Sequence, residues 1–223
     1  MQNTRLLIPI ILMGFLFSHS SCAQKKNNNH QQTTKIDAKD IEGLEKATVA
    51  GGCFWCVEAV FERVAGVKMA VSGYTGGAET TPTYEAVAAG KTSHAEAVEI
   101  YFDPKIISYR KILEVFFDTH DPTTLNRQGP DVGRQYRSAV YFHDDEQRKQ
   151  VQEVIAQLEQ KKKFNNPIVT ELVPYTTFYQ AEEYHQDYYE HNPNNPYIIN
   201  VTKPKIVKFE KNYQEILKNN YVK

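Results

Sequence analysis

The sequence predicts an α/β fold, a two-layer sandwich in which a ferredoxin-like, split βαβ sheet carries its helices on one side. Three observations predict it. Some segments have apolar residues at every second position, which predicts strands, and others have apolar residues at helical spacing. The first six predicted elements have the order β-α-β-β-α-β. Hydrophobic residues make up 41% of the 223 residues and charged residues 24%, a composition that builds a globular core. The chain has only 3 Cys, so apolar burial rather than a disulfide framework must hold the fold together.

The first three elements surround a pair of glycines. Residues 47–50 are a short apolar strand that ends at the glycines of positions 51–52. Over residues 54–64 the apolar residues recur at helical spacing with charged residues opposite, and Gly66 ends this helix. Alternation over residues 67–71 predicts the second strand of the sheet.

The later elements follow from the same two periodicities and from capping residues. Ser108 and Asp144 each precede an apolar stripe of helical spacing, and both residue types cap helix N-termini. We therefore expect a helix to begin after each of them. The other expected elements are strands over 98–102, 138–143 and 168–173 and a short helix over 181–190.

The N-terminal segment has the features of an export signal. Arg5 precedes an apolar run over 6–17, which is shorter than the ~20 residues that span a bilayer. Small polar residues follow, and their Ser-Ser-Cys ending resembles a bacterial lipoprotein signal, which implies lipid attachment at Cys22. We expect a signal peptide over 1–21, a polar tether over 22–45, and a protein exported to the envelope or periplasm of a bacterium.

The balance of charges excludes one class of partner. There are 26 Lys and Arg against 27 Asp and Glu, a formal net charge of −1. The basic surface expected of a nucleic-acid-binding protein is therefore missing. Nothing in the sequence indicates an oligomer, so we expect a monomer.

The chemistry gathers at a strand-to-helix junction, Gly51-Gly52-Cys53-Phe54-Trp55-Cys56. Backbone N–H groups and the helix dipole stabilise an anion there, so we expect the pKa of Cys53 to fall below its free value of about 8.5. Cys56 lies one turn further on the same helix face, a spacing that permits a disulfide. The alternative is a pair of buried structural thiols. A zinc site would need a second cysteine pair, and haem attachment would need histidine in place of Val57.

This hexapeptide resembles the active-site segment of the A-type peptide methionine sulfoxide reductases, which reduce the S epimer of methionine sulfoxide. Further blocks resemble that family in order along the chain: Tyr74-Thr75-Gly76-Gly77, Pro82-Thr83-Tyr84, His94-Ala95-Glu96-Ala97-Val98, His120-Asp121-Pro122, Gln128-Gly129-Pro130-Asp131, Gln135-Tyr136-Arg137-Ser138 and residues 181–188. The resemblance implies a catalytic domain over 46–210, with long coil extensions around the ferredoxin-like core, and leaves residues 211–223 as a C-terminal tail.

The resemblance also implies a role for each site residue. Cys53 matches the nucleophile that attacks sulfur. Tyr84 and Tyr136 match the tyrosines that donate hydrogen bonds to the sulfoxide oxygen. Asp131 matches the aspartate that orients the substrate. Phe54 and Trp55 match the aromatic residues that form the wall of the methyl pocket. His185 lies in a family block, but we interpret it as a structural residue. No metal or bound cofactor is implied, only an external thiol reductant.

Glu96 is the expected proton donor. It shares its strand parity with Val98 and Ile100, so it points with apolar side chains and away from the face of Glu99. Burial there raises the pKa of a carboxyl and lets it act as a general acid. Strand parity alone is equally consistent with a structural glutamate that is buried and paired with an arginine. The family resemblance favours the catalytic role over this structural one.

Recycling of the nucleophile is where this chain departs from the family pattern. Many members carry resolving cysteines near the C-terminus, whereas this chain has none after Cys56, which replaces a glycine often found there. We expect Cys56 to convert the sulfenic acid of Cys53 into a disulfide, which a thioredoxin-like partner would reduce.

Three other functions compete with this interpretation. A general thiol–disulfide oxidoreductase would also use Cys-x-x-Cys at a helix start, but it needs neither Glu96 nor paired tyrosines. A cysteine hydrolase would need His94, His120 or His185 beside Cys53 as a base. A binding module without enzymatic activity leaves the cysteine motif unexplained.

Overall fold

The computed structural model describes residues 39–222. The predicted signal peptide, most of the predicted tether and Cys22 lie outside the described residues. Within residues 39–222, no helix is both long enough and apolar enough to cross a membrane.

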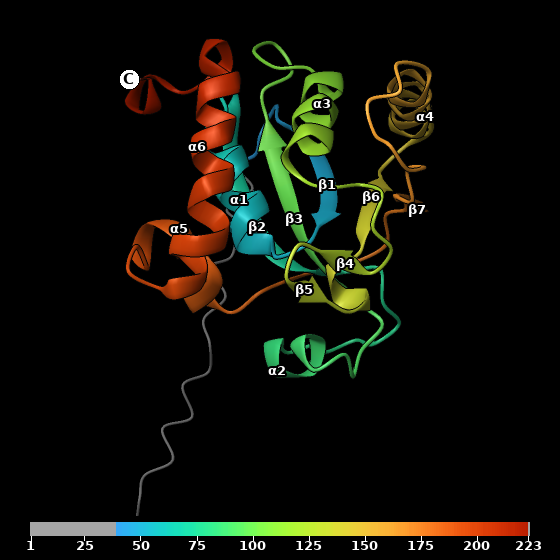
Figure 1. Cartoon of the computed structure of the whole chain (residues 1–223), viewed down its shortest axis with the longest axis vertical. Coiled ribbons are helices and arrows are strands. Elements are labelled where there is room, and N and C mark those ends of the chain that lie inside the picture. Colours follow the sequence, from blue (N-terminus) through green and yellow to red (C-terminus); the bar gives the residue numbers. More distant parts are fainter. Residues whose placement is uncertain (1–38, 223) are drawn as a thin grey trace, which may run out of the picture. The chain divides into compact units, whose positions relative to one another are not determined.

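A six-stranded sheet organises the described chain (Figure 1). Its order is β7-β6-β1-β3-β2-β8, and the four central strands have the order of the predicted split βαβ sheet. The mixed α/β class is therefore confirmed. β6 and β7 are parallel, and the other neighbouring pairs are antiparallel. The strands are β1 Glu45–Gly51, β2 Val67–Thr75, β3 Ala95–Phe102, β6 Ser138–Phe142, β7 Glu171–Pro174 and β8 Phe178–Gln180, and a separate hairpin joins β4 Arg127–Gln128 to β5 Asp131–Val132.

Helices α1 and α3 make the two crossovers of this sheet, and α6 packs beside α1 (Figure 1). The predicted caps are present, because the side chain of Ser108 accepts a hydrogen bond from the Lys111 amide and that of Asp144 from the Gln147 amide. The helices are α1 Phe54–Glu62, α2 Tyr84–Ala88, α3 Tyr109–Thr119, α4 Asp145–Gln160, α5 Tyr188–His191 and α6 Lys203–Asn212.

The two faces of β3 differ in character. Val98, Ile100 and Phe102 belong to the main core with the helices. Ala95 and Ala97 face the other side, in a small cluster with Ala50, Ala139 and Tyr141. Parity therefore places Glu96 on the helix side of the sheet, as predicted.

The C-terminal third differs most from the prediction. Residues 181–190 are not one helix: a 3-10 turn, Glu183–His185, is separated from α5 by Asp187, whose φ of 52° is left-handed. A right-handed helix cannot continue through that backbone. The expected strand over 168–173 begins only at Glu171. Helix α6 was not predicted, because its four Lys obscure a short apolar stripe.

Residues beyond α6, set apart as a tail in the sequence analysis, contact α1 in the structure. Leu217 is buried and forms a β-bridge with Val64. The Lys218 amide donates to the Arg63 carbonyl at 2.8 Å, and the Arg63 guanidinium lies over the ring of Tyr221 at 4.6 Å. These contacts tie the end of the described chain to the C-terminal end of α1, the helix that follows Cys53.

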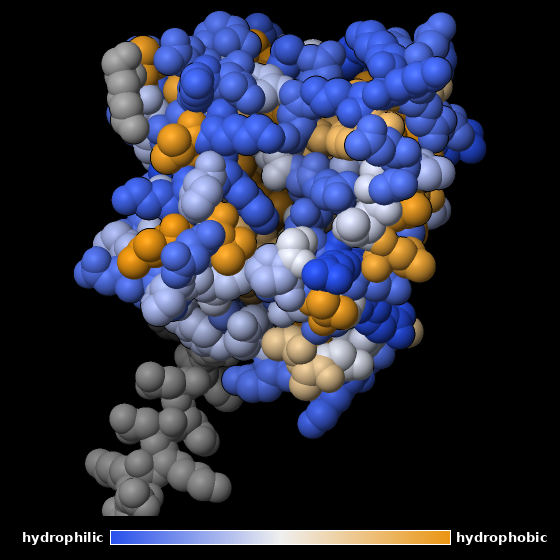
Figure 2. Space-filling model, in the orientation of Figure 1, coloured by the Kyte–Doolittle hydropathy of each residue, from blue (hydrophilic) through white to orange (hydrophobic). Residues whose placement is uncertain are grey.

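The surface in the view of Figure 2 is mostly hydrophilic, and its apolar residues occur in small separate groups. Scattered apolar side chains of this kind are normal on soluble domains. The reactive groups Cys53, Cys56 and Glu96 lie instead in the interior of the fold.

Candidate active site

Cys53 lies at the N-cap of α1, buried directly after the first strand. The chain turns there at Gly52, whose φ is +90°. A Cβ on Gly52 would lie 2.5 Å from the side chain of Gln128, which is itself held by two hydrogen bonds to the Asp121 backbone. Only glycine therefore fits immediately before the cysteine.

Replacing Gly52 with alanine is expected to destabilise the fold by about 3 kcal/mol or more. The left-handed backbone contributes about 1–2 kcal/mol, and the overlap with Gln128 about 1–3 kcal/mol. Gly43→Ala is the matched control, because Gly43 also has a positive φ of 74° but has nothing within 4 Å of the position that a Cβ would take. Urea denaturation of both variants checks this, and equal losses of stability would contradict it.

A cavity of about 150 Å³ opens at the start of α1. Seven of its lining residues are those that the sequence analysis expects at the site. The lining consists of Cys53, Phe54, Trp55, Tyr84, Glu96, Asp131, Tyr136 and Tyr197. Strands, helices and coil segments far apart in the sequence thus converge on Cys53.

Glu96 is 2% exposed and lies on β3, next to the start of α1. Its Oε2 accepts a hydrogen bond from the Phe54 amide at 3.1 Å. No arginine in the described part of the chain pairs with it. Burial is the main cause that raises the pKa of Glu96, to about 8, and the Asp131 charge adds to it. The carboxyl is therefore mostly protonated at neutral pH and can donate its proton into the cavity.

Tyr84 and Tyr136 bring two hydroxyl groups to the same cavity. Burial raises the pKa of Tyr84 to about 12, and it also raises the pKa of Tyr136. Both hydroxyls therefore keep their protons at neutral pH and are available as hydrogen-bond donors.

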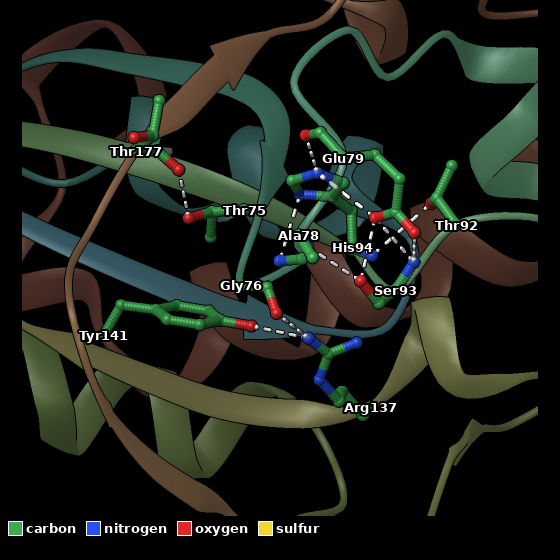
Figure 3. Close-up of polar contacts among 11 residues, drawn as sticks. Thr75, Gly76, Ala78, Glu79, Thr92, Ser93, His94, Arg137, Tyr141 and Thr177 are labelled. Carbon is green, nitrogen blue, oxygen red and sulfur yellow. Dashed lines mark hydrogen bonds and ion pairs between the residues drawn. The ribbon is translucent and has the colours of Figure 1, made fainter.

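Tyr84 is held in place from both sides of its loop. Its amide donates to Glu182 at 3.0 Å, and the same carboxylate accepts from Tyr74 on β2. At the base of the loop, Glu79 accepts hydrogen bonds from the amide and hydroxyl of Ser93 (Figure 3). These bonds close residues 79–93 into a loop of defined shape around α2.

His94 and Arg137 anchor the chain on either side of that loop (Figure 3). His94 is 1% exposed, and its Nε2 lies 2.8 Å from the carbonyl of Glu79. Arg137, next to Tyr136, donates to the carbonyl of Gly76 and to the hydroxyl of Tyr141. Arg137 therefore ties the segment that carries Tyr136 to the glycine that follows β2.

Trp55 forms an ordered aromatic wall of the cavity. Its ring stacks on Tyr188 at a centroid distance of 3.7 Å, and its Nε1 donates to Nδ1 of His185 at 3.1 Å. Burial lowers the pKa of His185 to about 4, so this histidine is neutral and acts as an acceptor. The contact agrees with the interpretation of His185 as a structural residue.

Tyr197 is a site residue that the sequence analysis missed. It is one of 14 Tyr and lies outside the quoted family blocks, so neither composition nor motif distinguishes it. Its hydroxyl donates to Asp131 at 2.5 Å, and it lines the cavity together with Cys53. Tyr197 thus holds the aspartate of the site beside the nucleophile.

The two thiols have different surroundings. Cys56 lies behind Cys53, where its Sγ is 3.2 Å from Thr202 Oγ1 and 3.8 Å from Lys205 Nζ. The hydrogen bond from Cys53 is the main cause that lowers the pKa of Cys56, to about 6, and Lys205 adds to it. Burial raises the pKa of Cys53, so the expectation from the helix dipole is wrong for this state. Desolvation is the largest cause of the raised pKa of Cys53, whereas hydrogen bonds and the Lys205 charge favour the anion at Cys56.

The structure disfavours one of the competing functions, a cysteine hydrolase. No histidine lines the cavity at Cys53: His120 bonds to Phe116 and Ser138, His94 contacts the Glu79 carbonyl, and Nδ1 of His185 accepts from Trp55 rather than from Cys53. The base of a cysteine hydrolase is thus missing from the described residues. Nor does any group of three His, Cys, Asp or Glu between positions 39 and 222 form a metal site.

The arrangement defines a thiol enzyme that acts on a small polar group next to an apolar one. The thiol, the protonated carboxyl and the tyrosine hydroxyls face one space with aromatic walls. Such a site can attack one atom of a ligand while it protonates and hydrogen-bonds an attached oxygen.

Comparison with known proteins identifies the family. The family model described as peptide methionine sulfoxide reductase matches residues 45–217. The chain is 48% identical over 187 residues to peptide methionine sulfoxide reductase MsrA of Polynucleobacter asymbioticus, covering 84% of this chain and 98% of that protein. It is 53% identical over 175 residues to the MsrA of Saccharolobus solfataricus, covering 78% of this chain and 98% of that protein.

Solved structures agree with the sequence matches. Mxr1 of Saccharomyces cerevisiae in its reduced form is 35% identical, with a TM-score of 0.64 over 74% of this chain and 92% of that one. Methionine sulfoxide reductase A of Corynebacterium diphtheriae is 32% identical, with a TM-score of 0.62 over 69% and 77%. The chain belongs to the peptide methionine sulfoxide reductase family, and it is an enzyme of the MsrA type.

Proposed function

We propose that this enzyme reduces the S epimer of methionine sulfoxide in oxidised proteins, with Cys53 as nucleophile and Glu96 as acid. The single observation that carries the proposal is the cavity itself. It brings a thiol, a protonated carboxyl and two tyrosine hydroxyls around one space, beside the aromatic wall of Phe54 and Trp55. The methyl group of the substrate would contact that wall, and its oxygen would accept from Tyr84 and Tyr136.

In the first step, Cys53 gives up its thiol proton and its Sγ attacks the sulfoxide sulfur while Glu96 protonates the sulfoxide oxygen. The oxygen passes to Cys53, which becomes a sulfenic acid, and methionine leaves. Methionine sulfur gains two electrons and Cys53 loses two. The proton released by the thiol restores Glu96, so the step is balanced. Asp131, held by Tyr197, would keep the substrate and the thiol aligned.

The second step would regenerate the nucleophile through Cys56. Cys56 is three residues from Cys53 on the same helix, and its amide bonds to the Cys53 carbonyl at 3.1 Å. Attack on the sulfenic acid would release water and form a Cys53–Cys56 disulfide. A dithiol reductant such as a thioredoxin-like protein would supply the two electrons that restore both thiols.

We further infer that the enzyme works in the cell envelope. Support comes from the basic and apolar N-terminal segment and from Cys22 at its small-residue end. Lipid attachment predicts that the protein incorporates a labelled fatty acid in cells and that Cys22→Ser removes the label. Labelling that survives this substitution would refute attachment at Cys22.

The experiment that tests the activity uses a peptide containing both methionine sulfoxide epimers. Purified enzyme and dithiothreitol should consume the S epimer and leave the R epimer, as followed by chromatography. Without reductant, one equivalent of substrate should yield methionine and a Cys53–Cys56 disulfide, as detected by mass spectrometry. No consumption of either epimer by folded enzyme would refute the activity. A lasting sulfenic acid without a disulfide would refute the role of Cys56 alone.

A further inference from the structure

Cys56 contacts a segment of the chain that does not line the active-site cavity. Thr202 ends the turn that leads into α6 and Lys205 lies in the first turn of α6; they approach the sulfur at 3.2 Å and 3.8 Å. Thr202 is fully buried, and Cys56 is 4% exposed. A buried sulfur thus has both a hydroxyl donor and a cation as neighbours.

The local backbone explains why these two residues reach the sulfur. Residues Ile198–Thr202 form a π-helical turn immediately before α6. The wider turn brings Thr202 and Lys205, three residues apart, onto the side that faces α1. Of the four Lys of α6, Lys205 alone is half-buried, and the others are exposed: Lys203, Lys208 and Lys211.

The charges around Cys56 favour a thiolate. The groups that face it or act on it are Cys53, Glu96, Asp131, Tyr197, Thr202 and Lys205. Lys205 is the cation among them, whereas Asp131 opposes a second negative charge. The Thr202 hydroxyl lies within hydrogen-bond distance of the sulfur and can donate to a thiolate there. The pKa of Cys56 is lowered to about 6 in these surroundings, although its burial acts in the opposite direction.

We propose that Lys205 holds Cys56 as a thiolate and is thereby a positioning residue for closure of the Cys53–Cys56 disulfide. The inference rests on the proposed resolving role of Cys56. Lys205 does not touch the substrate, since it lines a different cavity, next to His120 and Asp121. Its effect is on the thiol that acts second.

The step that Lys205 favours is a displacement at sulfur. The electron pair of the Cys56 thiolate forms the S–S bond, and the S–O bond of the Cys53 sulfenic acid breaks. The departing hydroxide takes the proton of Glu96 and leaves as water. Cys56 and Cys53 end as one disulfide, so no other oxidant or reductant is required. The thiolate form is the nucleophile, so its population at a given pH sets the rate.

The test uses the full chain with Cys22→Ser in every variant. In the Cys53→Ser background, Cys56 is the remaining thiol, and its thiolate absorbance at 240 nm is titrated. Lys205→Met should raise the midpoint by about one pH unit, because a positive charge near the sulfur is lost. Lys205→Arg should restore the wild-type midpoint. Lys208→Met, an exposed lysine on the same helix, is the matched control and should leave it unchanged.

A single-turnover experiment then tests the consequence with Cys53 present. With one equivalent of substrate and no reductant, Lys205→Met should form methionine at the wild-type rate. Its disulfide should close about fivefold more slowly at pH 6, and the difference should vanish above about pH 8, as a one-unit shift requires. Dimedone should trap the accumulated sulfenic acid.

Three outcomes would overturn the proposal. One is an unchanged thiolate midpoint in Lys205→Met, and another is a shifted midpoint with an unchanged rate of disulfide closure. The third is slower methionine formation, which would place Lys205 in the first step. If the wild-type enzyme forms no disulfide, the resolving role of Cys56 fails together with this proposal. If the wild-type enzyme forms the disulfide and Lys205→Met changes neither the midpoint nor the rate of closure, the role of Lys205 is refuted and the resolving role of Cys56 stands.

Discussion

Cys53→Ser is expected to lower the rate of sulfoxide reduction by a factor of at least about 10⁴, a typical cost for loss of a catalytic nucleophile. A serine hydroxyl in the same buried position is a much weaker nucleophile, and it cannot accept the oxygen as a sulfenic acid. The measurement is methionine release from the S epimer in a single turnover. The stability of the fold should change little, since sulfur and oxygen differ by little in size.

Cys22→Ser is the matched control for this loss. It makes the same chemical change in the chain but lies outside the catalytic domain expected from the sequence. Purified Cys22→Ser enzyme should therefore reduce the S epimer at the wild-type rate with dithiothreitol. Turnover that persists in Cys53→Ser would mean that another group attacks the sulfoxide, and the assignment of Cys53 would be wrong.

Glu96→Gln should slow methionine formation by about 10²–10³-fold, within the range of general acid catalysis. The amide has nearly the shape of the carboxyl but has no acidic proton for the sulfoxide oxygen. The raised pKa of Glu96, about 8, predicts a second signature. The wild-type single-turnover rate should lose the contribution of this acid as the pH rises through about 8. Because glutamine does not titrate, that loss should be absent from the variant.

Glu99→Gln provides the control on the same strand. Glu99 is also buried, at 3% exposure, but it lies on the opposite face of β3 and bonds to Lys46 and Tyr101. Its substitution should leave the rate per folded molecule unchanged. Equal losses in the Glu96 and Glu99 variants would show that Glu96 supports the fold rather than the reaction.

The burial of the thiols bears on another alternative, a general thiol–disulfide oxidoreductase. Cys53 is 6% exposed and Cys56 4%, and Cys53 faces a cavity lined by tyrosines and a protonated carboxyl. A general oxidoreductase needs an accessible thiol and has no use for Glu96. The site is built for a small group that enters the cavity. We therefore expect slow insulin reduction by this enzyme compared with its reduction of methionine sulfoxide.

Local patterns predicted the elements of the central fold because those elements bury regular stripes. Alternation predicted β2 and β3, and β1 and β6 were predicted as short strands. Helical spacing predicted α1, α3 and α4, with capping residues before α3 and α4. Strand parity also predicted correctly that Glu96 lies on the apolar face of β3. The N-terminal signal is equally a property of local composition, and it remains a prediction.

The C-terminal third did not follow from local patterns because tertiary contacts determine it. The left-handed backbone at Asp187 interrupts the expected helix over 181–190, and β8 exists only by pairing with the edge of β2. Helix α6 has a short apolar stripe that α1 covers. Such segments gain little stability from their own periodicity, so a scan of the sequence does not reveal them.

The sequence by itself determined which residues carry the chemistry, because the cysteine motif and its accompanying blocks are local features. Only the tertiary structure decided how those residues are tuned. It brought Tyr197 to Asp131 and Lys205 to Cys56, across 66 and 149 positions of the chain. It also buried Cys53, which raises the pKa that the sequence analysis expected to fall. Burial and the charges of distant segments set the pKa of a buried group, and neither can be read from the residues beside it.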